Sequence, residues 1–376
     1  MTINNEHKKL NVPNLRFPEF SGEWEKCKLG DLCNVLMCKR ILTSQTNTEE
    51  GVPFYKIGTI GNTPDAYISQ ELFDEYKAKY NYPHKGEVMI TCAGTVGKCV
   101  IYDGKDAYYQ DSNIVWIDNP SQYITNEFLY HLLYKVDWRK LNSTTIIRIY
   151  NDDLRNLKLN YPQIEEQQKI SRLQLLLDER IATQSKIIDK LQSLIKGIRN
   201  DVFGKLRKNI GFNAVVGDVL DYEQPQSYIV EDTEYTNEGT PVLTANKAFV
   251  LGYTLETDGV YDKGDCIIFD DFTLDCKYVD FPFKVKSSAI KILTAKNKEL
   301  LRYTFEFLKY LDLSTEEHKR HYIAETQNQE FILPTEQMVK TIAHIFSILS
   351  LRMEIAVKQR DEFEKQKQYL LRQMFI

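Results

Sequence analysis

The stretch ISRLQLLLDERIATQSKIIDKLQSLIKGIRNDV, from Ile170 to Val202, decides the fold, because apolar residues return along it every three or four positions. The apolar stripe is interrupted only at Gln184, and the stretch contains one glycine and no proline. Residues with this spacing lie on one face of a helix. The stretch therefore predicts one long amphipathic helix, which needs a partner to cover its apolar face.

A second stretch, from Ile342 to Met374, repeats the pattern 172 residues later in the same register, with polar interruptions at Arg360 and Lys367. Both stretches contain the same pair of successive four-residue steps. The two helices are the simplest partners for each other, and the order globular part, helix, globular part, helix favours antiparallel pairing. The alternative is that each helix packs separately on its own globular part.

The segments that precede the two helices also match one another in order, which predicts an internal repeat. The matched pairs are KLGDL (28–32) with VGDVL (216–220), GVPFYKIGTIGN (51–62) with GTPVLTANK (239–247), YPHKGEVMIT (82–91) with VYDKGDCIIF (260–269), FLYHLL (128–133) with FEFLKYL (305–311), and LKLNYPQIEEQ (157–167) with FILPTEQ (331–337). We expect an α+β fold with a pseudo-two-fold repeat, in which two domains of mixed strands and short helices are separated by two long helices packed as an antiparallel coiled coil. The expected boundaries are 1–160 for the first domain, 161–208 for the central helix, 209–333 for the second domain and 334–376 for the C-terminal helix.

Composition is ordinary for a soluble globular protein, with 43% hydrophobic and 27% charged residues in 376, a length that predicts two or more units. No stretch approaches the ~20 apolar residues of a membrane span, and the N-terminus lacks the apolar core of a signal peptide, so we expect a cytoplasmic protein. The seven cysteines form no C-x-x-C pair. They predict reduced, mostly buried thiols and no metal site.

The net charge of −5 excludes a uniformly basic nucleic-acid binder, but it averages two unlike regions. Residues 217–286 contain 15 acidic and 5 basic residues, whereas residues 164–208 contain 10 basic and 6 acidic residues. If the protein binds DNA, we expect the acidic region to face away from it, toward a basic partner protein.

Two similar domains on a spacer fit a ligand with repeated features. At 1.5 Å per residue the helices would span roughly 50–60 Å, and DNA half-sites read from one face recur about every 34–36 Å. Hydroxyl, amide, aromatic and basic side chains that can bind phosphates or base edges are concentrated near the end of each domain. The candidate DNA contacts are Lys98, Arg148, Tyr150 and Asn151 in the first domain and Lys247, Lys319, Arg320, His321 and Tyr322 in the second. Plain solvated surface is the alternative for each.

Catalytic patterns are weak. GTVGK at 94–98 is not a phosphate-binding P-loop, because Cys92 stands where the first glycine belongs and Cys99 follows the lysine. No glycine-rich turn suited to S-adenosylmethionine follows a strand. Asp65, Glu75 and Lys77 have the spacing of a Mg²⁺-dependent nuclease, which remains the alternative function. In such nucleases these residues lie on core strands, whereas the sequence around Glu75 predicts a helix.

The chain resembles the specificity subunits of type I restriction-modification systems over nearly its whole length. The resemblance is carried by LRFPEFSGEWEKCKLGDL (15–32), NTPDAYISQELFDEYKAKYNYPHKGEVMITCAGTVGK (62–98), LDERIATQSKIIDKLQSLIKGI (177–198) and FEKQKQYLLRQMFI (363–376). It implies a non-catalytic subunit whose two target-recognition domains read a bipartite, asymmetric double-stranded DNA site.

The resemblance also implies partners. Two methyltransferase subunits would dock on the spacer helices, and ATP-dependent restriction subunits would join through them. S-adenosylmethionine, ATP and Mg²⁺ would belong to these partners, with no cofactor or metal in this chain. We expect the partner contacts on the helices at Ile188, Leu191, Ile195, Arg360, Phe363 and Lys367.

Overall fold

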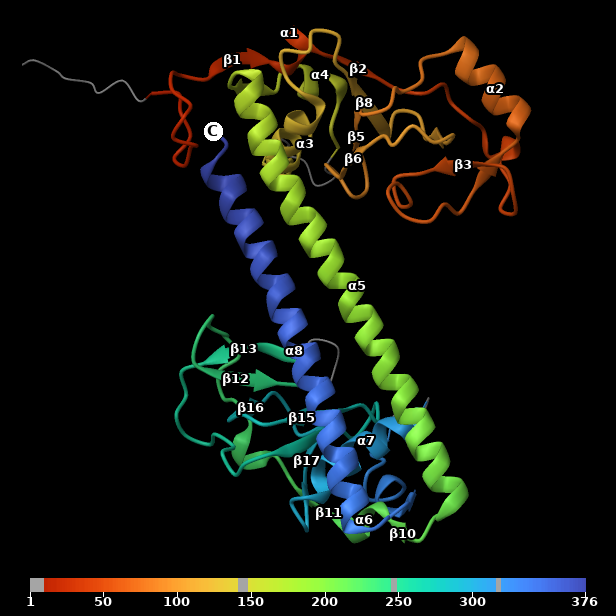
Figure 1. The fold of residues 1–376 in the computed structure, drawn as a ribbon, viewed down its shortest axis with the longest axis vertical. Helices are drawn as coiled ribbons and strands as arrows, with labels where there is room; N and C mark the ends of the chain where they lie inside the picture. The colour runs from red at the N-terminus through yellow and green to blue at the C-terminus, as the bar shows by residue number, and fades with distance from the viewer. Residues whose placement is uncertain (1–9, 141–147, 245–248, 316–318) are drawn as a thin grey trace, which may run out of the picture. The chain divides into compact units, whose positions relative to one another are not determined.

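The computed structural model describes residues 10–140, 148–244, 249–315 and 319–376, and it divides the chain into two compact units (Figure 1). Unit 1 consists of Met1–Ala182 with Arg360–Ile376, and unit 2 of Thr183–Gln359. Two long helices, α5 (Ile164–Asn209) and α8 (Glu336–Gln373), contribute to both units.

Unit 1 contains three small sheets. The four-stranded sheet has the order β2 (Asn34–Leu36), β8 (Ile114–Asp118), β5 (Val88–Thr91) and β6 (Cys99–Ile101); the three-stranded sheet has the order β4 (Tyr67–Ile68), β3 (Val52–Tyr55) and β7 (Tyr108–Tyr109); and β1 (Glu25–Lys28) pairs with β9 (Lys158–Tyr161). The short helices are α1 (Leu29–Leu32), η1 (Thr43–Gln45), α2 (Gln70–Lys79), α3 (Asn126–Lys135) and α4 (Asn151–Arg155). Side-chain caps begin the two longer ones, because Ser69 accepts from the Leu72 amide and Thr125 from the Phe128 amide.

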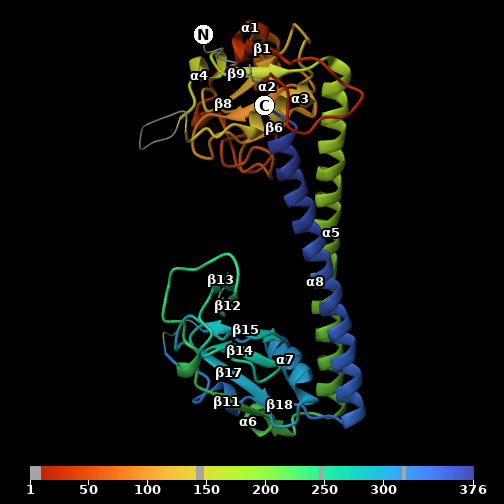
Figure 2. The same cartoon turned by 90° about the vertical axis from the view of Figure 1, so that its left-hand side faces the viewer.

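Unit 2 contains the same three kinds of sheet. They have the orders β11 (Leu220–Glu223), β17 (Ile290–Ala295), β14 (Cys266–Asp270) and β15 (Cys276–Val279); β13 (Val250–Thr254), β12 (Thr240–Leu243) and β16 (Lys284–Val285); and β10 (Ala214–Val215) with β18 (Glu330–Phe331). The helices are α6 (Val216–Val219), η2 (Gln226–Tyr228), α7 (Leu300–Leu311) and η3 (Thr326–Asn328). Figure 2 shows α7 between the four-stranded sheet and the long helices.

The predicted repeat is confirmed by this topology, because the strands of the two units pair in the same order. The register also repeats: Val88 lies opposite Ile101 and Ile117 in unit 1, and Ile267 lies opposite Tyr278 and Leu293 in unit 2. Among the described residues, unit 2 has no helix in the place of α2. The fold class is α+β as predicted, whereas the four domain boundaries stay predictions.

The long helices pack against each other within each unit. In unit 1, Ile170 of α5 and Leu371 of α8 belong to one apolar core, and in unit 2 Phe203 of α5 and Ile342 of α8 do so. The beginning of each helix therefore meets the end of the other, which confirms the antiparallel pairing. Most of the predicted stripe is buried or half-buried, but Ile345 is 40% exposed, so its inclusion was wrong.

Polar residues in the stripe have partners inside the chain. The Gln184 amide donates to the Ala356 carbonyl and to Gln359 Oε1, both at 3.1 Å, within unit 2. Within unit 1, Lys367 Nζ lies 2.5 Å from Asp178 Oδ1. Buried polar groups of this kind fix the register of a helix pair, since a shifted register would leave them unpaired.

All seven cysteines are free thiols, and Cys27 alone among them is not fully buried, as predicted. In the part of the chain that the structure describes, no helix is long and apolar enough to cross a membrane.

His131 of α3 makes the stability of unit 1 depend on pH. Its ring is 4% exposed, and burial, assisted by Lys367, lowers the pKa of His131 from 6.5 to about 4. Between these two values the unfolded chain binds the proton and the folded unit does not, so stability falls as the pH falls. We expect His131→Leu to remove about 3 kcal/mol of this pH dependence. Denaturant unfolding measured from pH 7 to pH 4 tests this. If the free energy of unfolding changed with pH equally in the wild type and in His131→Leu, the prediction would be contradicted.

Candidate nucleic-acid interface

The loop between β5 and β6 is a tightly bonded hairpin end in unit 1. The Thr91 amide donates to the Lys98 carbonyl at 3.0 Å, and the Gly97 amide donates to the Thr91 carbonyl at 2.8 Å. Gly94 and Gly97 have φ angles of 64° and 82°, which favour glycine. The Lys98 ammonium donates to the Ile60 carbonyl, so its charge is held beside the neighbouring loop.

The predicted segment 148–151 lies against this hairpin. The Ile149 amide donates to the Cys92 carbonyl at 2.9 Å, and Arg148 Nη2 donates to the Ser112 carbonyl at 3.3 Å. The Arg148 guanidinium lies over the Tyr150 ring, 5.9 Å from its centroid, and Tyr150 is 61% exposed. The structure therefore brings the predicted residues of the first domain to one end of the four-stranded sheet, where Tyr150 is exposed and the two basic side chains are half-buried.

Unit 2 contains the same arrangement. The His321 amide donates to the Asp271 carbonyl at 3.0 Å, and the Asp270 amide donates to the Asp275 carbonyl at 2.9 Å across the end of the β14–β15 hairpin. These bonds make His321 the counterpart of Ile149, and Arg320 therefore the counterpart of Arg148. The 172-residue spacing of the two helices also separates these two arginines.

The charge of the two hairpin ends is opposite. Asp275 occupies in unit 2 the position of Lys98 in unit 1, and it forms ion pairs with Lys309 at 2.6 Å and Lys277 at 3.3 Å. The acidic region of the sequence thus includes the loop that corresponds to the basic one. Polyanion binding at the two loops would require different contacts.

The predicted residues of the second domain divide into exposed and buried groups. Lys319 and Arg320 are exposed, and the bond from Lys319 lowers the pKa of Glu325. His321 and Tyr322 are each 1% exposed, and both of their amides donate to Asp271 Oδ1. Their side chains anchor the segment rather than face solvent. The remaining candidate, Lys247, lies outside the described residues.

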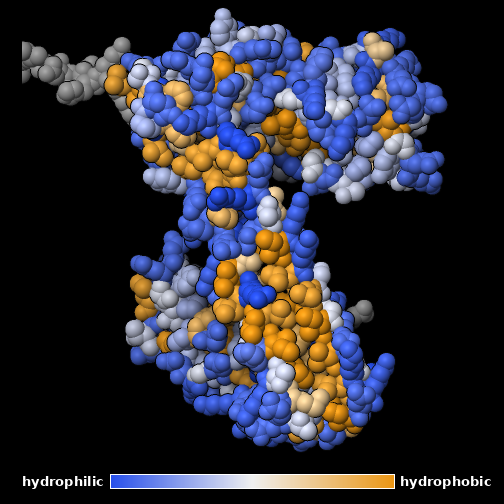
Figure 3. All heavy atoms as spheres, viewed as in Figure 1, coloured by the Kyte–Doolittle hydropathy of each residue, from blue (hydrophilic) through white to orange (hydrophobic). Residues whose placement is uncertain are grey.

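The predicted partner residues of the helices are turned inward. Ile188 and Lys367 are buried, Leu191, Ile195, Arg360 and Phe363 are half-buried, and the Arg180 guanidinium covers the Phe363 ring at 5.5 Å. The sequence analysis missed a second apolar face on unit 2, which Figure 3 shows along the two helices. This exposed apolar face consists of Ile187, Leu194, Ile345, Ile348 and Ile355, which are 40–50% exposed. Their spacing by three and seven residues was the signal in the sequence.

The residues of the nuclease alternative do not converge. Asp65 pairs with Lys56 at 2.9 Å, and Lys77 pairs with Asp106 at 2.8 Å. Glu75 is exposed on helix α2, not on a core strand. The described residues contain no group of three or more His, Cys, Asp or Glu side chains that could hold a metal ion. Burial raises the pKa of Cys92 to about 12, so this thiol is not a reactive nucleophile.

The fold is that of solved restriction-modification S subunits. A type I restriction-modification S subunit from M. genitalium matches with a TM-score of 0.68 at 16% identity, over 97% of this chain and 99% of that one. A chain from a structure of type I restriction-modification complex assembly and conformational transition matches with a TM-score of 0.50 at 16% identity, over 94% and 97%.

Sequence similarity covers shorter segments. Residues 21–193 match the model of the type I restriction modification DNA specificity domain. A putative type I restriction enzyme specificity subunit of Haemophilus influenzae is 52% identical over 143 residues, which are 38% of this chain and 37% of the relative. The specificity subunit of the type I restriction enzyme EcoR124I/EcoR124II of Escherichia coli is 44% identical over 126 residues, or 32% and 31%. The matched segments therefore span about a third of these curated relatives.

The repeated α+β fold with paired long helices is therefore shared with a solved S subunit. In the segments that match, the chain is similar to the specificity subunits of type I restriction-modification systems.

Proposed function

We propose that the chain is a non-catalytic subunit that reads a bipartite, asymmetric DNA site, one part through each unit, and that directs partner subunits to it. The observation that carries the proposal is the repeated geometry at the two hairpin ends, where Arg148 and Arg320 occupy equivalent positions. The similarity to specificity subunits supports it. The opposite charges at Lys98 and Asp275 support two different half-sites, because the two loops present different chemistry to the bases.

The predicted DNA contacts divide by burial, because His321 and Tyr322 are buried whereas the other described candidates are exposed or half-buried. Lys98, Arg148, Tyr150 and Asn151 in unit 1 and Lys319 and Arg320 in unit 2 are proposed to contact phosphates or base edges, since arginine pairs well with guanine and phosphate. His321 and Tyr322 are proposed to hold their segment in place through the bonds to Asp271. Lys247 stays a predicted contact.

Partners supply the chemistry in this proposal. Two methyltransferase subunits bind the long helices, and restriction subunits join through the methyltransferase. S-adenosylmethionine, ATP and Mg²⁺ bind to those subunits, and this chain holds no cofactor.

Co-expression with the methyltransferase subunits, followed by single-molecule sequencing of methylated bases in the host DNA, tests the function. We expect methylated adenine in one bipartite sequence. Arg148→Ala and Arg320→Ala should each relax one half of that sequence, at a cost of about 1–3 kcal/mol. Lys105→Ala is the control, because Lys105 is an exposed lysine that follows the other end of β6. The absence of any methylated sequence would contradict the proposal.

The exposed apolar face is the proposed contact for a methyltransferase subunit. The double substitution Ile348→Asp with Ile355→Asp should weaken assembly by roughly a hundred- to thousandfold, because about 3–4 kcal/mol of apolar burial is lost. Size-exclusion chromatography of the co-expressed subunits measures this. Leu42→Asp is the matched control, since Leu42 is 57% exposed and lies in unit 1. An equally stable complex with the double variant would exclude this face.

A further inference from the structure

A cavity of about 340 Å³ lies in unit 1 between α3, β6 and α5. Ile101, Tyr130 and Leu175 form apolar walls, and the carboxylates of Glu127 and Asp178 line it. Leu175 and the adjacent Leu176 are 45% and 39% exposed. The cavity therefore opens on a partly apolar surface of α5.

Two buried polar side chains in the wall lack partners. His131 is 4% exposed and Ser171 is 6% exposed, and neither His131 Nδ1 nor Ser171 Oγ has a hydrogen-bond partner among the described residues. An unmade hydrogen bond of a buried group costs about 1–3 kcal/mol. His131 is neutral at pH 7, so its free nitrogen can accept a hydrogen bond. A group that donates several hydrogen bonds would satisfy both side chains.

The repeat shows what fills the equivalent space in unit 2. The strand registers make Tyr278 on β15 the counterpart of Ile101 on β6, and the helix repeat makes Ser350 the counterpart of Asp178. Between them lies the guanidinium of Arg302, 4.8 Å from the Tyr278 ring centroid.

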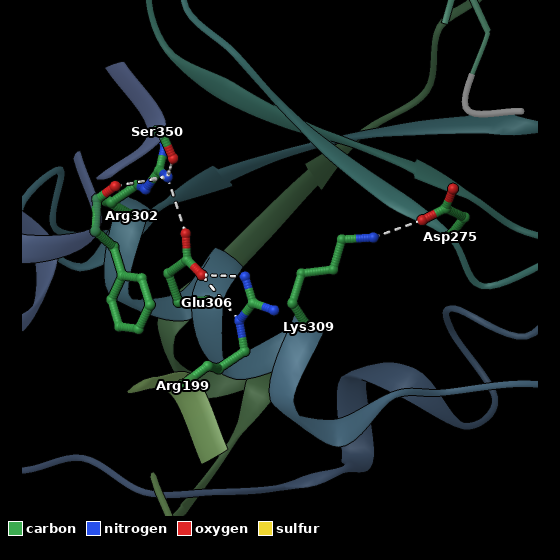
Figure 4. A network of polar contacts seen from close by, with 7 residues as sticks. Arg199, Asp275, Arg302, Glu306, Lys309 and Ser350 are labelled. Carbon is green, nitrogen blue, oxygen red and sulfur yellow. Dashed lines mark hydrogen bonds and ion pairs between the residues drawn. The ribbon is translucent and has the colours of Figure 1, made fainter. Parts of the chain in front are cut away.

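Arg302 comes from α7, the counterpart of α3, and its bonds are all internal to unit 2 (Figure 4). It donates to Glu306 Oε1 at 2.9 Å, to the Phe346 carbonyl at 3.3 Å and to the Ser350 hydroxyl. One alkylguanidinium group thus joins α7, α8 and β15.

No cation of α3 fills this space in unit 1. Glu127 has no ion pair with any described residue, and Asp178 shares its charge with Lys367. Arg172 also lines the cavity, but its side chain is exposed. Lys367 and the exposed Arg172 balance the two carboxylates in number, so the attraction for a further cation comes from Glu127, the carboxylate without an ion pair to a described residue.

We propose that this cavity takes an alkylguanidinium group from outside the chain, namely an arginine side chain of a partner protein. The guanidinium would donate to Glu127, His131 and Ser171, and its alkyl stem would pack on Ile101 and Tyr130. The exposed Leu175 in the cavity wall gives a protein segment further apolar contact, which a small free cation would not use. The identity of the partner as a methyltransferase subunit rests on the proposed function.

Binding of a probe tests the chemistry of the cavity. We expect the full chain to bind Nα-acetylarginine methylamide with a Kd of about 1–10 mM by ligand-observed NMR, and not to bind the uncharged citrulline analogue. Glu127→Gln should weaken binding about tenfold. Ile101→Trp should abolish it by filling the cavity. Glu165→Gln is the control, because Glu165 is an exposed carboxylate of unit 1, in the first turn of α5, that does not line the cavity. The proposal would be overturned if the arginine and citrulline probes bound equally well, or if neither bound.

An experiment on the assembled complex tests whether the guanidinium group in the cavity comes from the methyltransferase subunit. After co-elution with the methyltransferase subunits, the chain should lose binding of the arginine probe, since the partner's side chain occupies the cavity. A complex that binds the probe as the free chain does would overturn the partner assignment. Failure to co-elute would instead contradict the proposed function, and the probe titration of the free chain would still test the cavity.

Discussion

Replacing Glu306 by alanine should lower the free energy of unfolding of unit 2 by about 3–5 kcal/mol, because removal of one member of a buried ion pair leaves the others uncompensated. Glu306 is 1% exposed, and its carboxylate accepts from Arg199 Nε and Nη2 at 3.0 and 2.7 Å and from Arg302 at 2.9 Å. Figure 4 shows both guanidiniums converging on this one carboxylate. Without it, two adjacent cations from α5 and α7 would repel each other.

The tryptophans provide an internal control, because they report the unfolding of unit 1 and not that of unit 2. The three tryptophans, Trp24, Trp116 and Trp138, all belong to unit 1, so their fluorescence reports unit 1 alone. Hydrogen exchange in α7 should increase in Glu306→Ala, while the tryptophan unfolding curve should stay near that of the wild type. Glu299→Ala removes an exposed carboxylate paired with Lys340 and should cost less than about 1 kcal/mol. Equal costs for the two variants would refute the role of the network.

Gly97→Ala should destabilise unit 1 by about 2–5 kcal/mol. A Cβ atom at this position would lie 2.1 Å from Cδ1 of Trp138, whose ring is 5% exposed, so a core aromatic ring must move. The φ of 82° adds about 1–2 kcal/mol for a residue other than glycine. Because Gly97 closes the β5–β6 hairpin end, we also expect methylation to lose specificity for the half-site that unit 1 reads.

Gly22→Ala is the matched control for the clash. Gly22 has a nearly identical φ of 83°, but a Cβ there would meet nothing within 4 Å. Its cost should therefore be that of the backbone conformation alone. Tryptophan fluorescence during denaturant unfolding measures both variants, and it should also change in the folded Gly97→Ala protein. Indistinguishable unfolding curves for the two variants would show that Trp138 does not limit this position.

The equivalence of Arg148 and Arg320 could be predicted from the sequence, but the roles of the neighbouring residues could not. Arg148 and Arg320 are separated by the spacing of the helix repeat, so one alignment locates both. The tyrosines two residues later have the same spacing, yet Tyr150 is 61% exposed and Tyr322 is 1% exposed. The difference arises because Tyr322 packs against Phe269 and Tyr222, which come from strands about 50 and 100 residues away.

The inward placement of the predicted partner residues has the same origin. A stripe of apolar residues says that one face of a helix is covered, but not by what. Here each long helix covers the other, so the apolar stripes are buried within the chain. A second apolar face remains exposed on unit 2. Lys367 and Gln184 looked like interruptions in the stripe, but Asp178 and the Ala356 carbonyl, on the opposite helix, satisfy them.

By itself the sequence determined the two long helices and the order of the two related domains, and it favoured antiparallel pairing, because periodicity and repetition are properties of local sequence. Only the tertiary structure decided which side chains became buried, which arginines met Glu306 and where unit 1 kept a cavity that unit 2 fills with Arg302. Those outcomes depend on groups brought together from distant segments. Their energies come from desolvation and close packing, which exist only once those segments meet.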